Sequence, residues 1–359
     1  MNSLPRRTLL KALSATAPAR LLAKPDNTSH PQKMCVSAAS CAYRIRYSRI
    51  KEVSEGIPPV KAPITLLEHF RQLGAGGGQV SIRDWTQDGM ARKLRTYCEE
   101  HDLRLEGQIS LPNNSLDAER FDHQVRAAKE AGAPILRTVC LRGRRYEIFK
   151  SLEHWKNFVA TSYARVRRAE PILARHRMKL AIENHKDWRT QEFLQMMETF
   201  SQPHIGINLD TGNNISLLED PVTVTKALAP FTLTTHLKDM GVQAYKDGFL
   251  LAEVPLGQGF LDLPRIVSTC RKARPDVQFN LEMITRDPLR IPCKTPSYWA
   301  TFDKRKLAQD LATALTSVQT HQRNTPLPTL AGKSPAERVA NEEANNRACF
   351  AYAQQHLAL

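Results

Sequence analysis

The chain of 359 residues lacks any apolar run close to the roughly 18–20 residues that a membrane-spanning helix needs. Its seven cysteines form no C-x-x-C pair and are odd in number, which argues against a disulfide framework or a zinc–thiolate site. No G-x-G-x-x-G motif follows the first expected strand, and the glycine-rich segment 74–78 lacks the Lys-Ser/Thr pair of a phosphate-binding loop. These absences count against a membrane span, a disulfide-stapled domain and a dinucleotide-binding fold.

The formal net charge is +15, with 51 Lys and Arg against 36 Asp and Glu. A basic surface attracts anionic sugars, phosphates or nucleic acid. The basic residues are spread along the chain, and no basic block is interleaved with aromatic residues. We therefore expect a small-molecule partner and no nucleic acid.

The N-terminal segment Pro5-Arg6-Arg7-Thr8-Leu9-Leu10-Lys11 resembles a twin-arginine export signal. Small residues follow, with cleavage expected after Ala19 or Ala23, although Lys11 and Arg20 interrupt the apolar stretch. We take residues 1–30 as a leader, which predicts an exported or periplasmic protein. The alternative is a disordered basic tail on a cytoplasmic protein.

The body of the chain, residues 34–322, alternates short apolar runs with amphipathic segments of helical period. Eight strand–helix repeats predict an α/β fold, the (β/α)8 barrel, with a doubly wound open sheet as the alternative. The expected strands are Cys35–Tyr43, Val80–Ile82, Leu103–Leu111, Ile135–Leu141, Met178–Ile182, Ile205–Leu209, Leu233–His236 and Phe279–Met283.

The region 323–359 lies outside the repeat. A Pro-rich linker precedes a helix that we expect to start at Ser334, with Glu337 at capping-box spacing. We expect this helix to pack across the bottom of the barrel or against another subunit of a homo-oligomer. The preceding helix, residues 304–320, is expected to close the barrel series.

Polar side chains that bind metals stand at the ends of the last four expected barrel strands. They are Glu183, Asp210, His236 and Glu282. Each alone has an ordinary interpretation, such as a solvated rim acid or an Asx turn. Because parallel strands of a barrel end at one mouth, however, the four side chains should converge there. Carboxylate oxygens with one imidazole suit one divalent ion, Mn²⁺ above all, with Mg²⁺, Co²⁺ or Zn²⁺ as alternatives.

The segments Glu183-Asn184-His185, Leu209–Asn213, His236-Leu237-Lys238-Asp239 and Pro255–Gly259 are similar to those of the xylose isomerase-like TIM-barrel family, in its sugar phosphate isomerase/epimerase branch. The resemblance covers most of the chain. It implies that Glu183, Asp210, His236 and Glu282 bind the metal and that the two Glu act as catalytic acid and base. The implied reaction removes a proton next to a sugar carbonyl through a metal-stabilised enediolate.

Further residues near the strand ends are candidates for substrate binding. His185 and Lys238 follow ligand strands by one or two positions, and Asn213 stands where some related epimerases carry a histidine. Arg142 and Arg286 follow the fourth and eighth expected strands and could bind an anionic group.

Three other functions remain open at this point. A metal-dependent dehydratase or lyase acting on a keto-sugar, keto-glycoside or inosose would begin with the same proton abstraction. A sugar-binding barrel without activity would not need the paired Glu. A DNA-repair endonuclease of similar fold would need further His and Asp ligands, and no Asp-x-His follows His236.

Overall fold

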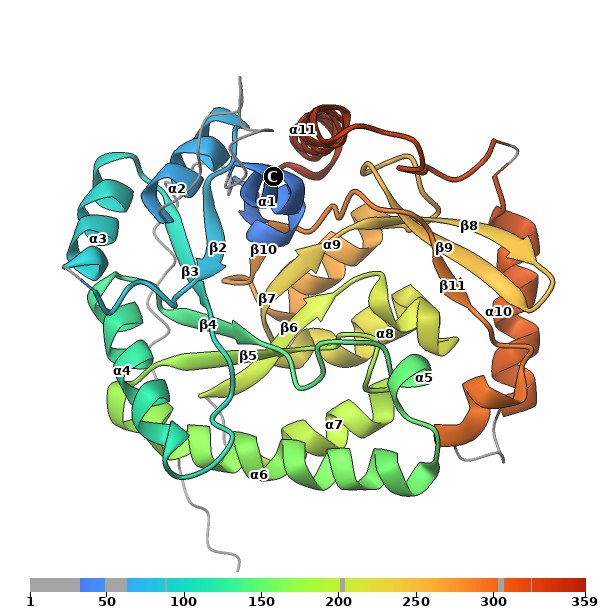
Figure 1. The fold of residues 1–359 in the computed structure, drawn as a ribbon, viewed down its shortest axis with the longest axis horizontal. Helices are drawn as coiled ribbons and strands as arrows, with labels where there is room; N and C mark the ends of the chain where they lie inside the picture. The colour runs from blue at the N-terminus through green and yellow to red at the C-terminus, as the bar shows by residue number, and fades with distance from the viewer. Residues whose placement is uncertain (1–32, 49–62, 88, 201–203, 303–306, 324) are drawn as a thin grey trace, which may run out of the picture. The chain divides into compact units, whose positions relative to one another are not determined.

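Eight parallel strands close into a barrel in the order β1-β10-β7-β6-β5-β4-β3-β2, so the predicted (β/α)8 architecture is confirmed (Figure 1). The computed structural model describes residues 33–48, 63–87, 89–200, 204–302, 307–323 and 325–359; the expected leader lies outside them. The barrel strands are β1 (Cys35–Ser37), β2 (Gly77–Ser81), β3 (Arg104–Gln108), β4 (Ile135–Thr138), β5 (Lys179–Glu183), β6 (Ile205–Asp210), β7 (Thr232–Leu237) and β10 (Gln278–Leu281).

Helices surround the barrel because its strands are buried on both faces and need an outer layer. Every residue of β6 and β7 is buried. In β7 the Thr232 hydroxyl donates to Leu228 O (3.0 Å) and the Thr235 hydroxyl to Gln278 O (3.2 Å), so these polar side chains are satisfied. The helices between barrel strands are α1 (Ala42–Tyr47), α2 (Pro63–Gln72), α3 (Met90–Glu100), α4 (Asp117–Glu130), α5 (Arg145–Ile148), α6 (Leu152–His176), α7 (Thr190–Thr199), α8 (Pro221–Leu228) and α9 (Leu263–Ala273).

Helix starts follow the expected capping chemistry at α8 and depart from it at α7. The Asp220 carboxylate accepts from Thr223 N (2.7 Å), and Pro221 occupies the first turn of α8. Thr190, the expected cap of α7, is instead its first helical residue. The Glu192 carboxylate accepts a hydrogen bond from the backbone N–H of Arg189, the residue before the helix (2.9 Å).

A second, three-stranded sheet lies beside the barrel and was not predicted. It contains β8 (Asp239–Tyr245), β9 (Gly248–Val254) and β11 (Leu289–Ile291) in the order β11-β9-β8. Helix α10 (Leu307–His321) packs on β8 and β9 rather than completing the barrel layer, so its expected role was wrong. The apolar face of α10 meets this added sheet.

The C-terminal helix α11 (Pro335–Tyr352) begins with the predicted capping box of Ser334 and Glu337. It does not pack across the barrel bottom. Instead it contacts α1 and the turn that follows the carboxyl end of β1, and Figure 1 shows it beside α1. Among the described residues, none of the helices combines the length and apolar character that a bilayer span requires.

Candidate metal and catalytic site

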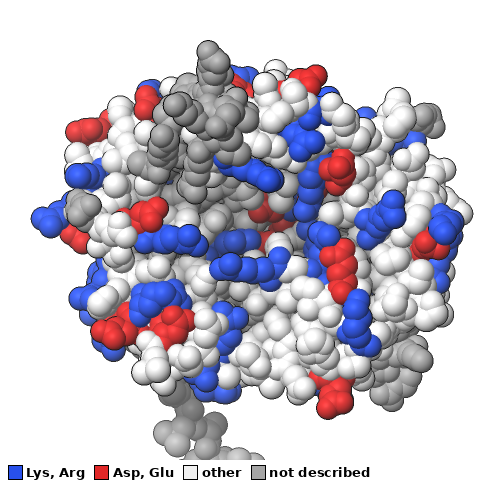
Figure 2. Space-filling model, viewed as in Figure 1, with Lys and Arg blue, Asp and Glu red and all other residues white. Residues whose placement is uncertain are grey.

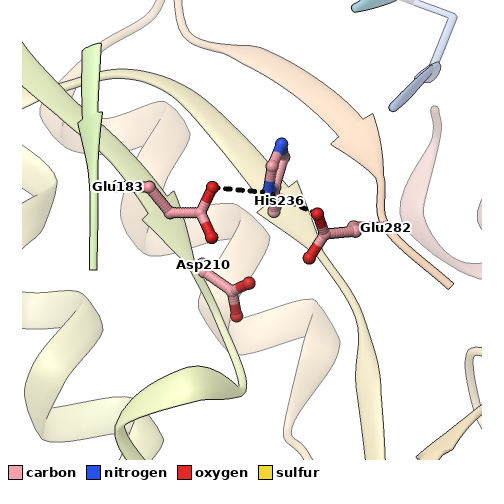
Figure 3. Close-up of side chains that lie close together, drawn as sticks. All are labelled: Glu183, Asp210, His236 and Glu282. Atoms are coloured by element: carbon pink, nitrogen blue, oxygen red, sulfur yellow. Dashed lines mark ion pairs between the residues drawn. The ribbon is translucent and has the colours of Figure 1, made fainter. Parts of the chain in front are cut away.

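Strand register brings the four predicted ligands together at the carboxyl end of the barrel. In the β6–β7 pair a register shift after Ile207 places Asp210 directly opposite His236. Glu183 ends β5, and Glu282 directly follows β10. One ligand atom from each of the four side chains lies within 4.8 Å of the others, and all four residues are buried. Figure 3 shows Glu183 and Glu282 on opposite sides of His236.

The His236 ring is held between these carboxylates and the barrel interior. Its Nδ1 lies 3.2 Å from Glu183 Oε2 and 3.1 Å from Glu282 Oε1. Its Nε2 lies 2.9 Å from Gln79 Oε1. The Gln79 amide is oriented in turn by Glu106, because Gln79 Nε2 donates to Glu106 Oε2 (2.9 Å). Gln79 therefore accepts from His236 Nε2–H, which leaves Nδ1 directed at the site.

Lys238, in the His236-Leu237-Lys238 segment, contacts two of the clustered carboxylates. Its Nζ is 2.8 Å from Asp210 Oδ2 and 2.7 Å from Glu282 Oε2. A further buried carboxylate, Glu253 of β9, is 3.8 Å from the same ammonium. The other oxygen of Asp210 accepts from the backbone N–H groups of residues 212 and 213, both at 3.0 Å.

Arg137, in the middle of β4, forms the tightest contact of Glu183. Its Nε donates to Glu183 Oε2 at 2.6 Å, and its Nη2 donates to the same oxygen. Asn213 Nδ2 donates to the other oxygen at 3.3 Å. Asn213 also accepts from the buried Lys186 ammonium, so it links that lysine to Glu183.

Burial and charge shift the pKa values of these groups in opposite directions. Burial raises the pKa of Glu183, but Arg137 and His236 more than offset this and hold it well below its usual value. Glu282 behaves in the same way, with His236 and Lys238 as the compensating charges. Burial raises the pKa of Asp210 to about 6 despite Lys238. Burial lowers the pKa of His236, but Glu282 and Glu183 dominate and raise it to about 9.

The donor set fits a divalent cation. Three buried carboxylates and one imidazole supply hard oxygens and one nitrogen. Asp210 Oδ2 and His236 Nδ1 are buried, and their partners are charged groups: the Lys238 ammonium at 2.8 Å from Asp210 Oδ2, and the carboxylates of Glu183 and Glu282 at 3.2 and 3.1 Å from His236 Nδ1. A cation bound by the four residues would take the place of the Lys238 ammonium and of the His236 Nδ1 proton as partner of these carboxylates.

The predicted substrate-binding residues are distributed around this cluster. His185 Nδ1–H donates to Leu141 O (2.9 Å), and its Nε2 is 4.0 Å from Glu183 Oε1. Arg142 is exposed and donates to the Ser110 hydroxyl (2.8 Å). Arg286 is paired with Glu253, with Nε 3.0 Å from Oε2, so its charge is already balanced.

A cavity of about 890 Å³ opens beside the cluster, on the side of β2, β3 and β4. Arg137 and His185 belong to both the cavity wall and the surroundings of Glu183. Figure 2 shows a central hollow with acidic atoms at its floor and Lys and Arg side chains around it. The volume is large enough for a monosaccharide-sized ligand.

Several residues of the site were not predicted from the sequence. They are Gln79, Glu106, Arg137, Lys186 and Glu253. For Glu106, Arg137 and Glu253 the sequence did carry a signal, namely a charged residue inside an apolar strand-like run, which needs a buried partner. Lys186 has no comparable signal because it follows its strand in a polar turn.

Residues 67–313 match the family described as the xylose isomerase-like TIM barrel. The chain belongs to this family. The match spans more than half of the chain and includes all four converging residues, which confirms the resemblance found in the sequence. No curated protein is significantly similar in sequence to this chain.

Solved structures share the fold at low sequence identity. A xylose isomerase-like TIM barrel protein from Mycobacterium smegmatis in complex with magnesium is 16% identical, covers 79% of this chain and 98% of its own, and gives a TM-score of 0.54. An L-ribulose 3-epimerase is 12% identical, with coverages of 90% and 94% and a TM-score of 0.54. The probable 3-DHS dehydratase AsbF from Bacillus anthracis is 14% identical, with coverages of 81% and 100% and a TM-score of 0.51. At these identities the likeness concerns the fold alone.

Proposed function

We propose that this protein is a divalent-metal-dependent sugar isomerase or epimerase. The observation that carries the proposal is the placement of Glu183 and Glu282 on opposite sides of His236 Nδ1, at 3.2 and 3.1 Å, beside a cavity of monosaccharide size. Family membership and the likeness to an L-ribulose 3-epimerase support this class of reaction. A divalent ion, Mn²⁺ by preference, held by Glu183, Asp210, His236 and Glu282 would polarise a substrate carbonyl and stabilise the charge of an enediolate.

The two glutamates would act as base and acid on opposite sides of the substrate carbon. Both carboxylates have lowered pKa values, so both are ionised near neutral pH and either can accept a proton. Arg137 fixes Glu183 Oε2 in place, whereas Glu183 Oε1 has the weaker contact with Asn213 and is the better placed oxygen to receive a proton. Inversion requires one glutamate to be ionised and to remove the proton, while the other has taken up a proton from solvent and delivers it to the opposite face of the carbon.

Lys238 would assist by hydrogen bonding to a substrate oxygen. Its ammonium is fully buried between Asp210 and Glu282, and these charges raise its pKa, so it stays protonated. An ammonium group that donates a hydrogen bond here would stabilise a substrate oxygen that gains negative charge as the proton leaves the neighbouring carbon.

A dehydratase or lyase is the second candidate function. It is supported by the likeness to the probable dehydratase AsbF and by the shared first step, since proton removal next to a carbonyl also precedes expulsion of a β-hydroxyl. The two functions differ in the step after proton removal, which is either return of a proton or loss of the leaving group.

One experiment separates these functions. The Mn²⁺-loaded protein is incubated in D₂O with a panel of ketoses, keto-glycosides and inososes, and the products are analysed by NMR. Deuterium next to the carbonyl of an intact skeleton supports isomerisation or epimerisation, whereas loss of water or of the aglycone supports a lyase. Glu183→Gln and Glu282→Gln should each abolish exchange while Glu198→Gln, on α7, should not; exchange that persists in the first two variants contradicts the assigned roles.

We also propose that the leader exports the folded protein. The paired Arg6-Arg7 is the feature that carries this proposal. Replacing both with lysine should retain the protein in the cytoplasm of a bacterium with twin-arginine transport. Unchanged periplasmic recovery would show that the segment is not a signal of this type.

A further inference from the structure

The cavity beside the cluster has an unusually basic wall. Its lining includes five arginines and a single carboxylate, Asp117, among the residues that the structure describes. The arginines are Arg83, Arg120, Arg137, Arg142 and Arg165. A neutral sugar has no need of such a wall, because uncharged hydroxyl groups are recognised by neutral or singly charged donors and acceptors.

Two of these arginines are already neutralised by carboxylates. Arg137 pairs with Glu183, and Arg120 pairs with Asp117, with Nη2 3.0 Å from Oδ2. Within the described ranges, Arg83, Arg142 and Arg165 form no ion pair with a carboxylate. The cavity wall thus retains positive charge that the protein itself does not balance.

Three guanidinium groups converge on one short segment of this wall, residues 110–111 after β3. Arg142 donates to the Ser110 hydroxyl (2.8 Å), Arg120 to Ser110 O (3.1 Å) and Arg165 to Leu111 O (3.0 Å). The Nε of Arg165 is buried and has no hydrogen-bond partner among the described residues. Neutral contacts of this kind hold the guanidinium groups in position and leave N–H donors for an anion.

Burial and mutual repulsion show that the arrangement is costly without a ligand. Burial lowers the pKa of Arg165; Cys140 and Asp117 act against this, and the charges of Arg142 and Arg120 act with it. Like charges brought together at the wall of a cavity are relieved by a bound anion.

We propose that the substrate carries an anionic group, a carboxylate or a phosphate, that binds to Arg142 and Arg165 in this cavity. The inference rests on the proposed function, because it places the anion at one end of a sugar whose carbonyl end reaches the glutamate cluster past Arg137 and His185. Arg142 was a candidate for this role from the sequence, and Arg165 was not. Arg286 is unsuited to it because Glu253 already pairs with it.

The binding test uses metal-free full-length protein, so that no anion binds through a metal. Inorganic phosphate and malonate are titrated by calorimetry at low ionic strength into the wild type and into Arg142→Gln, Arg165→Gln and the control Arg92→Gln. Arg92 is an exposed helix α3 arginine, with 78% of its side chain accessible, that pairs with Glu130 outside the cavity. Loss of one charge-assisted contact should weaken anion binding about tenfold in the two cavity variants and leave the control unchanged.

The relative affinities identify the source of the anion: tighter phosphate indicates a phosphorylated sugar, and tighter malonate a sugar acid. Failure of both anions to bind, or equal binding by wild type and Arg142→Gln, overturns the inference.

A second measurement separates this inference from the proposed function. Deuterium exchange by Mn²⁺-loaded protein is compared for a neutral ketose, a ketose phosphate and a keto-uronic acid. The inference requires faster exchange with one anionic substrate and a rise in its KM in Arg142→Gln. Equally fast exchange with the neutral ketose would confirm the proposed function and overturn the anionic substrate.

Discussion

Replacing Gln79 with leucine tests whether the barrel interior sets the metal affinity. Gln79 Oε1 is 2.9 Å from His236 Nε2, and Gln79 Nε2 donates to Glu106 (2.9 Å). Glu106 also accepts from the Thr234 hydroxyl (2.8 Å), so the whole relay is held by barrel strands. Leucine is comparable to glutamine in volume, although one atom shorter, and it removes the polar contacts. The His236 ring then loses the acceptor that keeps Nδ1 directed at the site.

The expected magnitude follows from similar interactions in other proteins. Loss of a hydrogen-bond partner behind a ligating histidine typically costs 10–100-fold in metal affinity, or about 1.4–2.7 kcal/mol. Thr234→Val removes one donor to Glu106 but leaves Gln79 in place, so it should have a clearly smaller effect. Gln195→Leu, on the exposed face of α7, controls for the substitution itself.

The assay is calorimetric titration of the purified variants with Mn²⁺, alongside urea unfolding of the metal-free proteins. Unfolding separates a general loss of stability from a specific loss of metal affinity. A Gln79→Leu protein that is folded and binds Mn²⁺ as tightly as the wild type would refute the argument that this relay orients His236.

Three further predictions concern other parts of the molecule. Lys238→Met should bind Mn²⁺ about tenfold more tightly in calorimetry, because the ammonium no longer occupies Asp210 Oδ2; weaker binding would contradict this competition. The Ser40 hydroxyl donates to Leu281 O and accepts from Met283 N, on either side of Glu282. Ser40→Ala should therefore lower the free energy of unfolding in urea by about 1–3 kcal/mol and slow deuterium exchange into the substrate. Unchanged values of both would exclude a role for Ser40 in positioning Glu282. Burial raises the pKa of Glu342 to about 7, so its contribution to the unfolding free energy is complete below about pH 4.5 and is lost as the pH rises through 7. The unfolding free energy of Glu342→Gln should therefore rise by about 1–3 kcal/mol relative to that of the wild type between pH 5 and pH 8. A difference between the two proteins that stays constant with pH would disprove the shift.

The barrel and its four converging ligands were predictable because both arise from short-range patterns. An apolar strand that ends in a carboxylate or an imidazole is visible in the sequence, and barrel topology then places successive strand ends at one mouth. This argument located Asp210 and His236 without any knowledge of the β6–β7 register. The register shift after Ile207, which sets the two residues directly opposite each other, has no sequence signal that we recognise.

The added sheet was missed although part of its signal was present. Lys246 and Asp247 form the two-residue turn that joins β8 to β9, and the Asp247-Gly248 pair between two partly apolar runs is a sequence signal for such a hairpin. No strand was expected in this segment, and the buried Glu253 on β9 was not predicted either. The partners of α10 and α11 were unpredictable for another reason, since a helical period shows that a helix has an apolar face but not which surface covers it.

Taken together, the charges at the mouth explain how three neighbouring carboxylates coexist in a buried site. Without a metal, Glu183 is balanced by Arg137, while Asp210 and Glu282 share Lys238 and the protonated His236. Lys238 and His236 therefore supply about the charge that a divalent cation would bring. Because desolvated carboxylates cannot remain unpaired, the protein keeps the cluster ordered and ionised before any ion binds. Glu253, 3.8 Å from Lys238, offers the lysine an alternative partner when Asp210 Oδ2 is needed elsewhere. This arrangement suits a site whose ligands must be in position, and whose base must be ionised, when the substrate arrives.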